Sequence, residues 1–190
     1  MIYTATIEGL PLQTGDIICT TDGAEGSVRG AIWRAIGRLV PGDIDHCIVY
    51  VGPGFHCVEA GARGVIAYEM PGGVWDALAL AATRGQLIDT FYGVAYPLER
   101  RGLDTAQQQT IRAGVASFCL EQVALHQPYN PLFFDPHTDD AFYCSQLIYR
   151  AYLNYGIDLN SNRDVPTALG TEHIIFPQEI WNACVTRKAG

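Results

Sequence analysis

Two short runs of β-branched and aromatic residues place the strongest constraint on how this chain can fold. The runs cover residues 45–52 and 55–60, and the segment Gly52-Pro53-Gly54-Phe55 joins them. Runs of this composition, bounded by Gly and Pro, indicate a β-hairpin. Pro at the second turn position and Gly at the third suit a type II turn. The sequence therefore predicts two neighbouring antiparallel strands at this point.

The expected turn also decides which side chains of the hairpin lie together. A two-residue loop places Ile48 opposite Glu59, so His46 shares a face with Glu59 as a diagonal neighbour within reach of long side chains. Asp43 and Asp45 are alternative partners for a ring nitrogen of His46. An imidazole held by a carboxylate is the arrangement of a general base and its orienting group.

A second feature is a helix that is expected to begin at Cys144. Gly156 suits its end, and apolar or aromatic residues follow the cysteine at helical spacing: Leu147, Ile148, Ala151, Tyr152 and Tyr155. Free amides and the positive end of the helix dipole in the first turn favour a thiolate, the reactive form of cysteine. A lone Cys on an apolar helix face is more often a core residue, and a lone His46 a structural one. The catalytic hypothesis therefore depends on Cys144, His46 and Glu59 together.

The ordered set of segments resembles a known family. The chain is similar, from about Gly15 to Ile180, to the circularly permuted, YiiX-like branch of the NlpC-type papain-like cysteine peptidases, in which the His strand precedes the Cys helix. The segments that carry this resemblance are Gly15-Asp16-Ile17-Ile18, His46-Cys47-Ile48-Val49-Tyr50-Val51-Gly52, Val58-Glu59-Ala60, Pro128-Tyr129-Asn130 and Tyr143-Cys144-Ser145.

The resemblance implies both a fold and a set of site residues. It implies an α+β papain-like domain in which an antiparallel sheet packs against helices and the cysteine lies at a helix N-terminus. Cys144 would be the nucleophile, His46 the general base and then acid, and Glu59 the residue that orients the imidazole. Tyr129 and Tyr143 would line the substrate pocket near the thiol.

The chain departs from the family pattern at two positions. An acid is expected after the tyrosine where this chain has Asn130, and often a Glu two places after the cysteine where it has Gln146. Neither position belongs to the triad, so the departures bear on substrate recognition.

The function implied is that of a cysteine hydrolase, a peptidase or amidase that forms an acyl-enzyme on a peptide or amide bond, with murein-derived peptides as one candidate substrate. No metal or organic cofactor is required. Two alternatives stay open: a lipid-directed thiol acyl hydrolase or acyltransferase of the same fold, and a binding module that has lost activity.

Metal binding is the main rival interpretation of the histidines and cysteines. His46-Cys47 and His56-Cys57 offer four ligand types, but adjacent residues on a strand point to opposite faces, so the four cannot converge on one ion without a bulge. Residues 135–140 contain acids that suit a hard cation, yet they lack the loop pattern of a calcium hand. We expect no metal site.

Composition sets the broad class. A chain of 190 residues with 48% hydrophobic content is long enough for one core, and we expect a single domain over residues 1–190. A formal net charge of -8 argues against nucleic acid as a partner. Residues 1–8 do not resemble a signal peptide, and no stretch reaches the roughly 18 apolar residues of a membrane helix. A cytoplasmic protein is the default expectation, with action on cell wall outside the membrane left open and the oligomeric state undetermined.

The remaining pattern predicts further elements of both kinds. Strands are expected near residues 15–19, 64–69, 90–98 and 174–176, helices over 28–39 and from Pro177, and either type over 75–80. A long helix is expected from Asp104 or Thr105, with Thr105 and Gln108 as a capping box, and an apolar side made of Ile111, Val115, Phe118, Cys119 and Val123.

Overall fold

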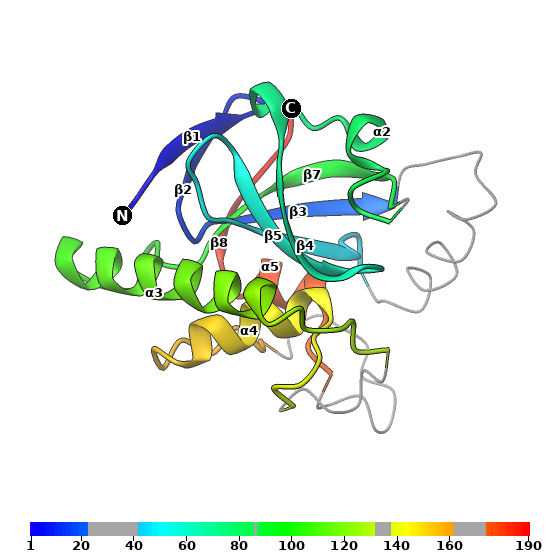
Figure 1. Ribbon diagram of the computed structural model, residues 1–190. Coiled ribbons are helices and arrows are strands. Elements are labelled where there is room, and N and C mark those ends of the chain that lie inside the picture. Colours follow the sequence, from blue (N-terminus) through cyan, green and yellow to red (C-terminus); the bar gives the residue numbers. More distant parts are fainter. Residues whose placement is uncertain (23–41, 86, 132–137, 162–173) are drawn as a thin grey trace.

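An antiparallel sheet of six strands forms the centre of the structure, which is a computed structural model that describes residues 1–22, 42–85, 87–131, 138–161 and 174–190 (Figure 1). The strand order is β6-β5-β4-β3-β7-β8. The bounds are β3 (Ile17–Asp22), β4 (His46–Tyr50), β5 (His56–Gly61), β6 (Gly64–Glu69), β7 (Asp89–Tyr96) and β8 (Val185–Lys188). A separate hairpin is made of β1 (Thr4–Ile7) and β2 (Leu10–Gln13).

Helices cover the sheet, so the fold is α+β. The described helices are η1 (Pro71–Gly73), α2 (Ala77–Leu80), α3 (Thr105–Ala124), α4 (Cys144–Leu153) and α5 (Pro177–Asn182). Helices α3 and α4 pack against each other and against β4 and β5. Figure 1 shows them on one side of the sheet, with the β1–β2 hairpin and α2 on the other. The helix expected over residues 28–39 lies outside the described residues.

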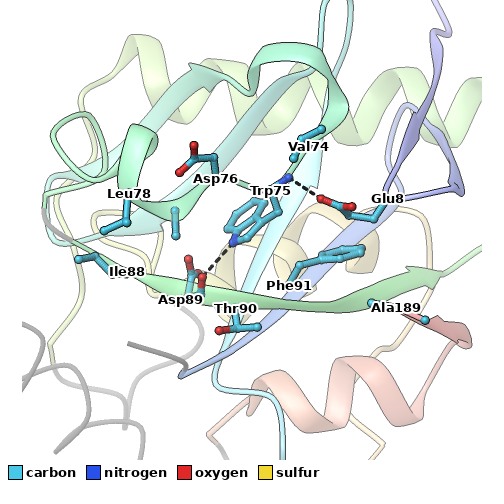
Figure 2. A pocket seen from close by; sticks show the side chains of 12 residues that line it. Glu8, Val74, Trp75, Asp76, Leu78, Ile88, Asp89, Thr90, Phe91 and Ala189 are labelled. Carbon is cyan, nitrogen blue, oxygen red and sulfur yellow. Dashed lines mark hydrogen bonds between the residues drawn. The ribbon is translucent and has the colours of Figure 1, made fainter. Parts of the chain in front are cut away.

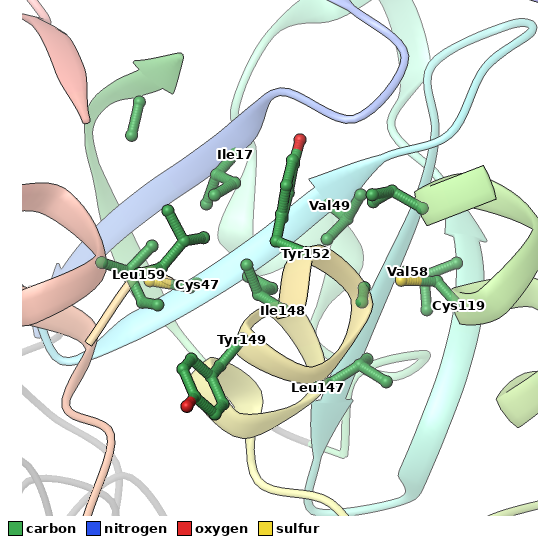
Figure 3. Close-up of a cluster of buried hydrophobic side chains, with 14 of the residues drawn as sticks. Ile17, Cys47, Val49, Val58, Cys119, Leu147, Ile148, Tyr149, Tyr152 and Leu159 are labelled. Carbon is green, nitrogen blue, oxygen red and sulfur yellow. The ribbon is translucent and has the colours of Figure 1, made fainter. Parts of the chain in front are cut away.

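Both faces of the sheet are apolar because both are covered. Along β4, Cys47 and Val49 belong to the cluster beneath α3 and α4, whereas Ile48 and Tyr50 belong to the cluster on the opposite face. Figure 3 shows Ile148 and Leu147 of α4 lying against the first of these clusters. Burial of a Leu or Ile side chain contributes about 1.5–3 kcal/mol, so these contacts anchor the start of α4 on the sheet.

The register of the β4–β5 hairpin is as predicted, but its turn is not. Val49 lies opposite Val58, which places Ile48 opposite Glu59. The predicted type II turn over residues 52–55 is wrong because the turn lies one residue later: the amide of His56 donates to the carbonyl of Pro53 at 3.3 Å, and Gly54 and Phe55 between them take positive φ values of 64° and 61°. The amides of Val51 and Gly52 both donate to the carbonyl of His56, which closes the loop in another way.

The two main helices begin where the sequence indicates. Helix α4 starts at Cys144, and Gly156 takes a positive φ of 70° shortly after its end. Helix α3 starts at Thr105, but its capping box is one residue earlier than predicted: Asp104 accepts from the amide of Gln107, whose side chain accepts from the amide of Asp104. The carboxylate therefore takes the cap position, which Asp favours strongly.

The predictions for the shorter strands and helices are confirmed in part. The strand predictions that correspond to β3, β6 and β7 are confirmed, and residues 77–80 form a short helix. Residues 174–176 do not form a strand, whereas β1, β2 and β8 went unpredicted. In the described part of the chain, no helix has both the length and the apolar character needed to cross a membrane.

Candidate functional site

Cys144 is the first residue of α4 and is 7% exposed. Two contacts fix the chain around it. The side-chain oxygen of Gln146 accepts from the backbone amide of Tyr143 at 3.2 Å, and the hydroxyl of Ser145 donates to the carbonyl of Ile175 at 2.6 Å. The thiol therefore lies in the first turn of a well-anchored helix, at the positive end of the helix dipole.

His46 lies at the start of β4 and contacts the carboxylate that the hairpin register places nearest to it. Its Nε2 is 2.9 Å from Oε2 of Glu59, and the two residues are 8% and 1% exposed. Of the other two acids considered, Asp43 accepts from the hydroxyl of Tyr92 at 3.0 Å. Glu59 is thus the predicted carboxylate whose contact with the imidazole is seen directly.

The thiol and the imidazole lie within interaction range of each other. Burial alone would lower the pKa of His46, but the influence of the nearby Cys144 and the contact with Glu59 outweigh it and raise the pKa well above its ordinary value. Because Nε2 faces Glu59, Nδ1 is the ring nitrogen that could accept a proton from the thiol. Glu59 therefore contacts the imidazole directly, and Cys144 is near enough to change the pKa of the same ring.

Glu59 has a second partner that the sequence did not reveal. Arg84 is fully buried and donates from Nη2 to Oε2 of Glu59 at 2.7 Å and from Nε to Oε1 at 3.1 Å. The same guanidinium pairs with Asp89 of β7, with Nη1 2.7 Å from Oδ1. Thr20 donates to the other oxygen of Asp89 at 2.6 Å. A buried ionic network therefore continues from the imidazole across the sheet.

Charge keeps the carboxylate of Glu59 ionised despite its burial. Burial would raise the pKa of Glu59, but the charge of Arg84 and the hydrogen bond with His46 lower it to about 2. A buried charge is tolerated only when it is paired and hydrogen-bonded, and this carboxylate is both.

The two tyrosines expected near the thiol differ in their surroundings. Burial raises the pKa of the partly exposed Tyr129, and Cys144 raises it further. Tyr143 is 2% exposed, and its hydroxyl accepts from the amide of Ile175 at 3.0 Å. A substrate contact for either tyrosine stays a prediction.

The two positions that depart from the family pattern touch each other. Asn130 donates from its amide nitrogen to the side-chain oxygen of Gln146 at 3.1 Å, and both residues are buried. Backbone bonds join the same segments, since the amide of Asn130 donates to Phe142 and the amide of Phe142 donates to Pro128. A neutral amide pair therefore ties the segment of Tyr129 to the start of α4.

The histidine and cysteine pairs on β4 and β5 do not converge. Cys47 lies in the core cluster beneath α4, whereas Cys57 belongs to the cluster on the opposite face. His56 is exposed, and its Nδ1 lies 2.5 Å from the carbonyl of Pro53. Among the residues that the structure describes, no group of three or more His, Cys, Asp or Glu side chains could hold a metal ion. Residues 135–137 of the acidic segment 135–140 lie outside them.

A pocket of about 840 Å³ lies at the other end of the ionic network (Figure 2). Trp75 forms part of its wall and donates from its ring nitrogen to the carbonyl of Asp89 at 3.0 Å, while its backbone amide donates to Glu8 at 3.0 Å. The exposed side chains of Val74 and Leu78 also line the pocket. None of Cys144, His46 and Glu59 lines it, so the pocket is separate from the thiol.

Comparison with protein-family models, with curated proteins and with solved structures gives no significant match to this chain. The chemical interpretation of the site therefore depends on its geometry and on the sequence pattern.

Proposed function

We propose that this protein is a cysteine hydrolase that cleaves a peptide or amide bond through an acyl-enzyme on Cys144. The observation that carries the proposal is the contact of His46 with the ionised carboxylate of Glu59 at 2.9 Å, and it is supported by Cys144, which raises the pKa of the same imidazole. Nucleophile, base and orienting group in hydrogen-bonding sequence are the parts that covalent catalysis by a thiol requires.

The chemistry follows from that order. The thiol proton moves to Nδ1 of His46, and the sulfur of Cys144 attacks the carbonyl carbon. The tetrahedral intermediate collapses, the carbon–nitrogen bond breaks, and the imidazolium gives its proton to the leaving amine. Water then attacks the thioester and gives a proton to His46; a second collapse releases the carboxylic acid and restores the thiol.

The start of α4 supplies the stabilisation of the oxyanion. Cys144 is the first helical residue, so its own backbone amide and the positive end of the helix dipole lie beside the sulfur. Donors that are already oriented toward a developing negative charge are worth about 3–4 kcal/mol each in related acyl transfers. No metal is needed for this step.

The finer assignment, to a circularly permuted papain-like fold of the NlpC type, is part of the same proposal. It is supported by the antiparallel sheet that carries His46 and Glu59, by the helix headed by Cys144 that packs on it, and by the order of His before Cys along the chain. On this basis the substrate is a peptide or amide, with murein-derived peptides as a candidate and lipid amides or esters as the alternative.

The test is alkylation by iodoacetamide between pH 5 and pH 9, followed at each cysteine by mass spectrometry. We expect Cys144 to react well below the pH of about 8.5 at which a free thiol ionises, and this reactivity at low pH to disappear in His46→Ala. Burial raises the pKa of Cys57, Cys119 and Cys184, so these thiols should react slowly.

Cys184→Ala is the matched control, because Cys184 is a partly exposed cysteine outside the triad and its removal should leave the Cys144 profile unchanged. A Cys144 that alkylates no faster at pH 6 than Cys184, with no effect of His46→Ala, would overturn the enzyme proposal. That outcome would favour a non-catalytic binding module.

A further inference from the structure

Arg84 is the most deeply buried charged side chain next to the proposed site, and it is bound by two carboxylates at once. Its guanidinium reaches both oxygens of Glu59, at 2.7–3.1 Å, and both oxygens of Asp89, at 2.7 and 3.0 Å. The rings of Trp75 and Tyr68 lie 4.8 and 5.4 Å from the guanidinium carbon. These contacts hold the side chain of Arg84 in one conformation. They also fix the carboxylate of Glu59 in addition to its contact with His46.

His46 and Arg84 share one oxygen of Glu59, and this decides which nitrogen of the imidazole carries the proton. Oε2 receives Nη2 of Arg84 at 2.7 Å and Nε2 of His46 at 2.9 Å. An ionised carboxylate can only accept hydrogen bonds, so Nε2 must carry the proton and Nδ1 is free to accept one from the thiol. A protonated Glu59 could instead donate to Nε2, which would leave the proton of a neutral imidazole on Nδ1, the nitrogen that the base must keep free.

We propose that Arg84 is a positioning residue that holds Glu59 as an ionised acceptor and thereby selects the tautomer in which His46 can accept a proton from Cys144. Its side-chain hydrogen bonds go to Glu59 and Asp89, so it acts on His46 through Glu59. The catalytic meaning of this inference rests on the proposed function, but the protonation of the two buried groups can be measured without any substrate.

The charges around Glu59 support the same conclusion. Two carboxylates, Glu59 and Asp89, and one guanidinium leave the network with one negative charge, which an imidazolium at His46 would balance. The other titratable groups that face Glu59 and Arg84 are Tyr68 and Cys57, and burial raises the pKa of each, so both stay neutral. Beyond them, Cys144 faces the imidazole.

The experiment compares Arg84→Met and Arg84→Lys in the full chain, each combined with Cys144→Ala so that His46 titrates without the thiol. Nitrogen-15 NMR of the His46 ring reports its titration midpoint and its neutral tautomer. Arg63→Met is the matched control, because Arg63 is an exposed arginine that donates to the carbonyls of Ala82 and Thr83 in the same segment and does not contact Glu59.

With Arg84 present, we expect the neutral ring to carry its proton on Nε2. In Arg84→Met the proton should move to Nδ1 and the titration midpoint should fall by about one pH unit or more, the size expected for losing an ionised partner. Arg84→Lys keeps the positive charge but not the paired donors of the guanidinium. Its titration midpoint and its tautomer populations should therefore lie between those of the parent and of Arg84→Met. A folded Arg84→Met with unchanged tautomer and midpoint would overturn the inference.

Arg84→Met leaves two buried carboxylates without a cation and so risks unfolding, which circular dichroism would reveal. The variant Arg84→Met with Asp89→Asn keeps the net charge of the network and tests the same prediction in that case. If its His46 keeps the proton on Nε2, the inference fails. Because no turnover is measured, the result stands even if Cys144 proves unreactive and the proposed function fails.

Discussion

Nε2 of His46 and Nη2 of Arg84 meet at the same oxygen of Glu59, at 2.9 and 2.7 Å. Glu59 is 1% exposed, so water cannot replace either partner if one is lost. The same carboxylate therefore serves the stability of the sheet and the protonation of the proposed base. Substitutions at this position should affect both.

Replacing Glu59 by Gln should destabilise the fold by about 3 kcal/mol, because it removes one anionic partner from a buried guanidinium. Urea denaturation at pH 7 measures the loss. Glu69→Gln is the control, since Glu69 is exposed on the neighbouring strand β6 and its change should stay within about 0.5 kcal/mol. A loss at Glu59 no larger than that of the control would mean that the pairing contributes little.

The acid dependence of stability should also identify Glu59. Its pKa in the folded protein is about 2 against an ordinary value of 4.5, so the unfolded chain binds the proton more tightly. The stabilisation is complete above pH about 4.5 and is lost as the pH falls toward 2. The difference in unfolding free energy between the parent and Glu59→Gln should therefore shrink over that interval. A difference that stays constant down to pH 2 would contradict the low pKa.

Asp16 should show the opposite sign. It pairs with Arg112 at 2.7 Å, yet burial outweighs that pairing and raises the pKa of Asp16 from 3.8 to about 6. The folded protein then binds the proton more tightly, so this group lowers stability as the pH rises from about 4 to 6. The unfolding free energy of Asp16→Asn relative to the parent should rise over that interval by about 3 kcal/mol. A flat or falling difference would show that Arg112 dominates.

A side chain at Gly64 should clash with the backbone of the segment that leads to Tyr129. It has a positive φ of 82°, and a Cβ there would lie 2.5 Å from the carbonyl oxygen of Gln127. Gly102→Ala is matched in φ, at 70°, but meets no atom within 4 Å, so it measures the backbone strain alone. We expect about 1 kcal/mol for Gly102→Ala and about 2–4 kcal/mol for Gly64→Ala in thermal unfolding. Equal losses would mean that the 127–130 segment moves aside freely.

Local patterns were enough to predict half of the candidate site. The hairpin composition gave the register that brings His46 and Glu59 together, and helical spacing gave the start of α4 at Cys144. The type II turn was wrong because the register can be kept by more than one loop conformation, so the paired strands do not determine the turn.

Arg84 and Asp89 could not be predicted in the same way. Arg84 follows a segment with no clear periodicity, and its partner Glu59 lies 25 residues away in the chain. The signal that could have found it is energetic: a carboxylate on a strand that is apolar on both faces needs a cation. The strand β8 was not predicted because it is four residues long and partly exposed, with Arg187 and Lys188 at its end.

The separation of His46 and Cys47 onto opposite faces of β4 has a consequence for the folding of the sheet. His46 contacts the carboxylate of Glu59, whereas the next residue, Cys47, lies in the apolar cluster on the opposite face of the sheet. A slip of β4 by one position would bury an imidazole among apolar side chains and leave Glu59 facing a thiol. A misregistered β4 is thus penalised on both faces of the sheet, so the contacts that position the proposed base also fix the alignment of the strand that carries it.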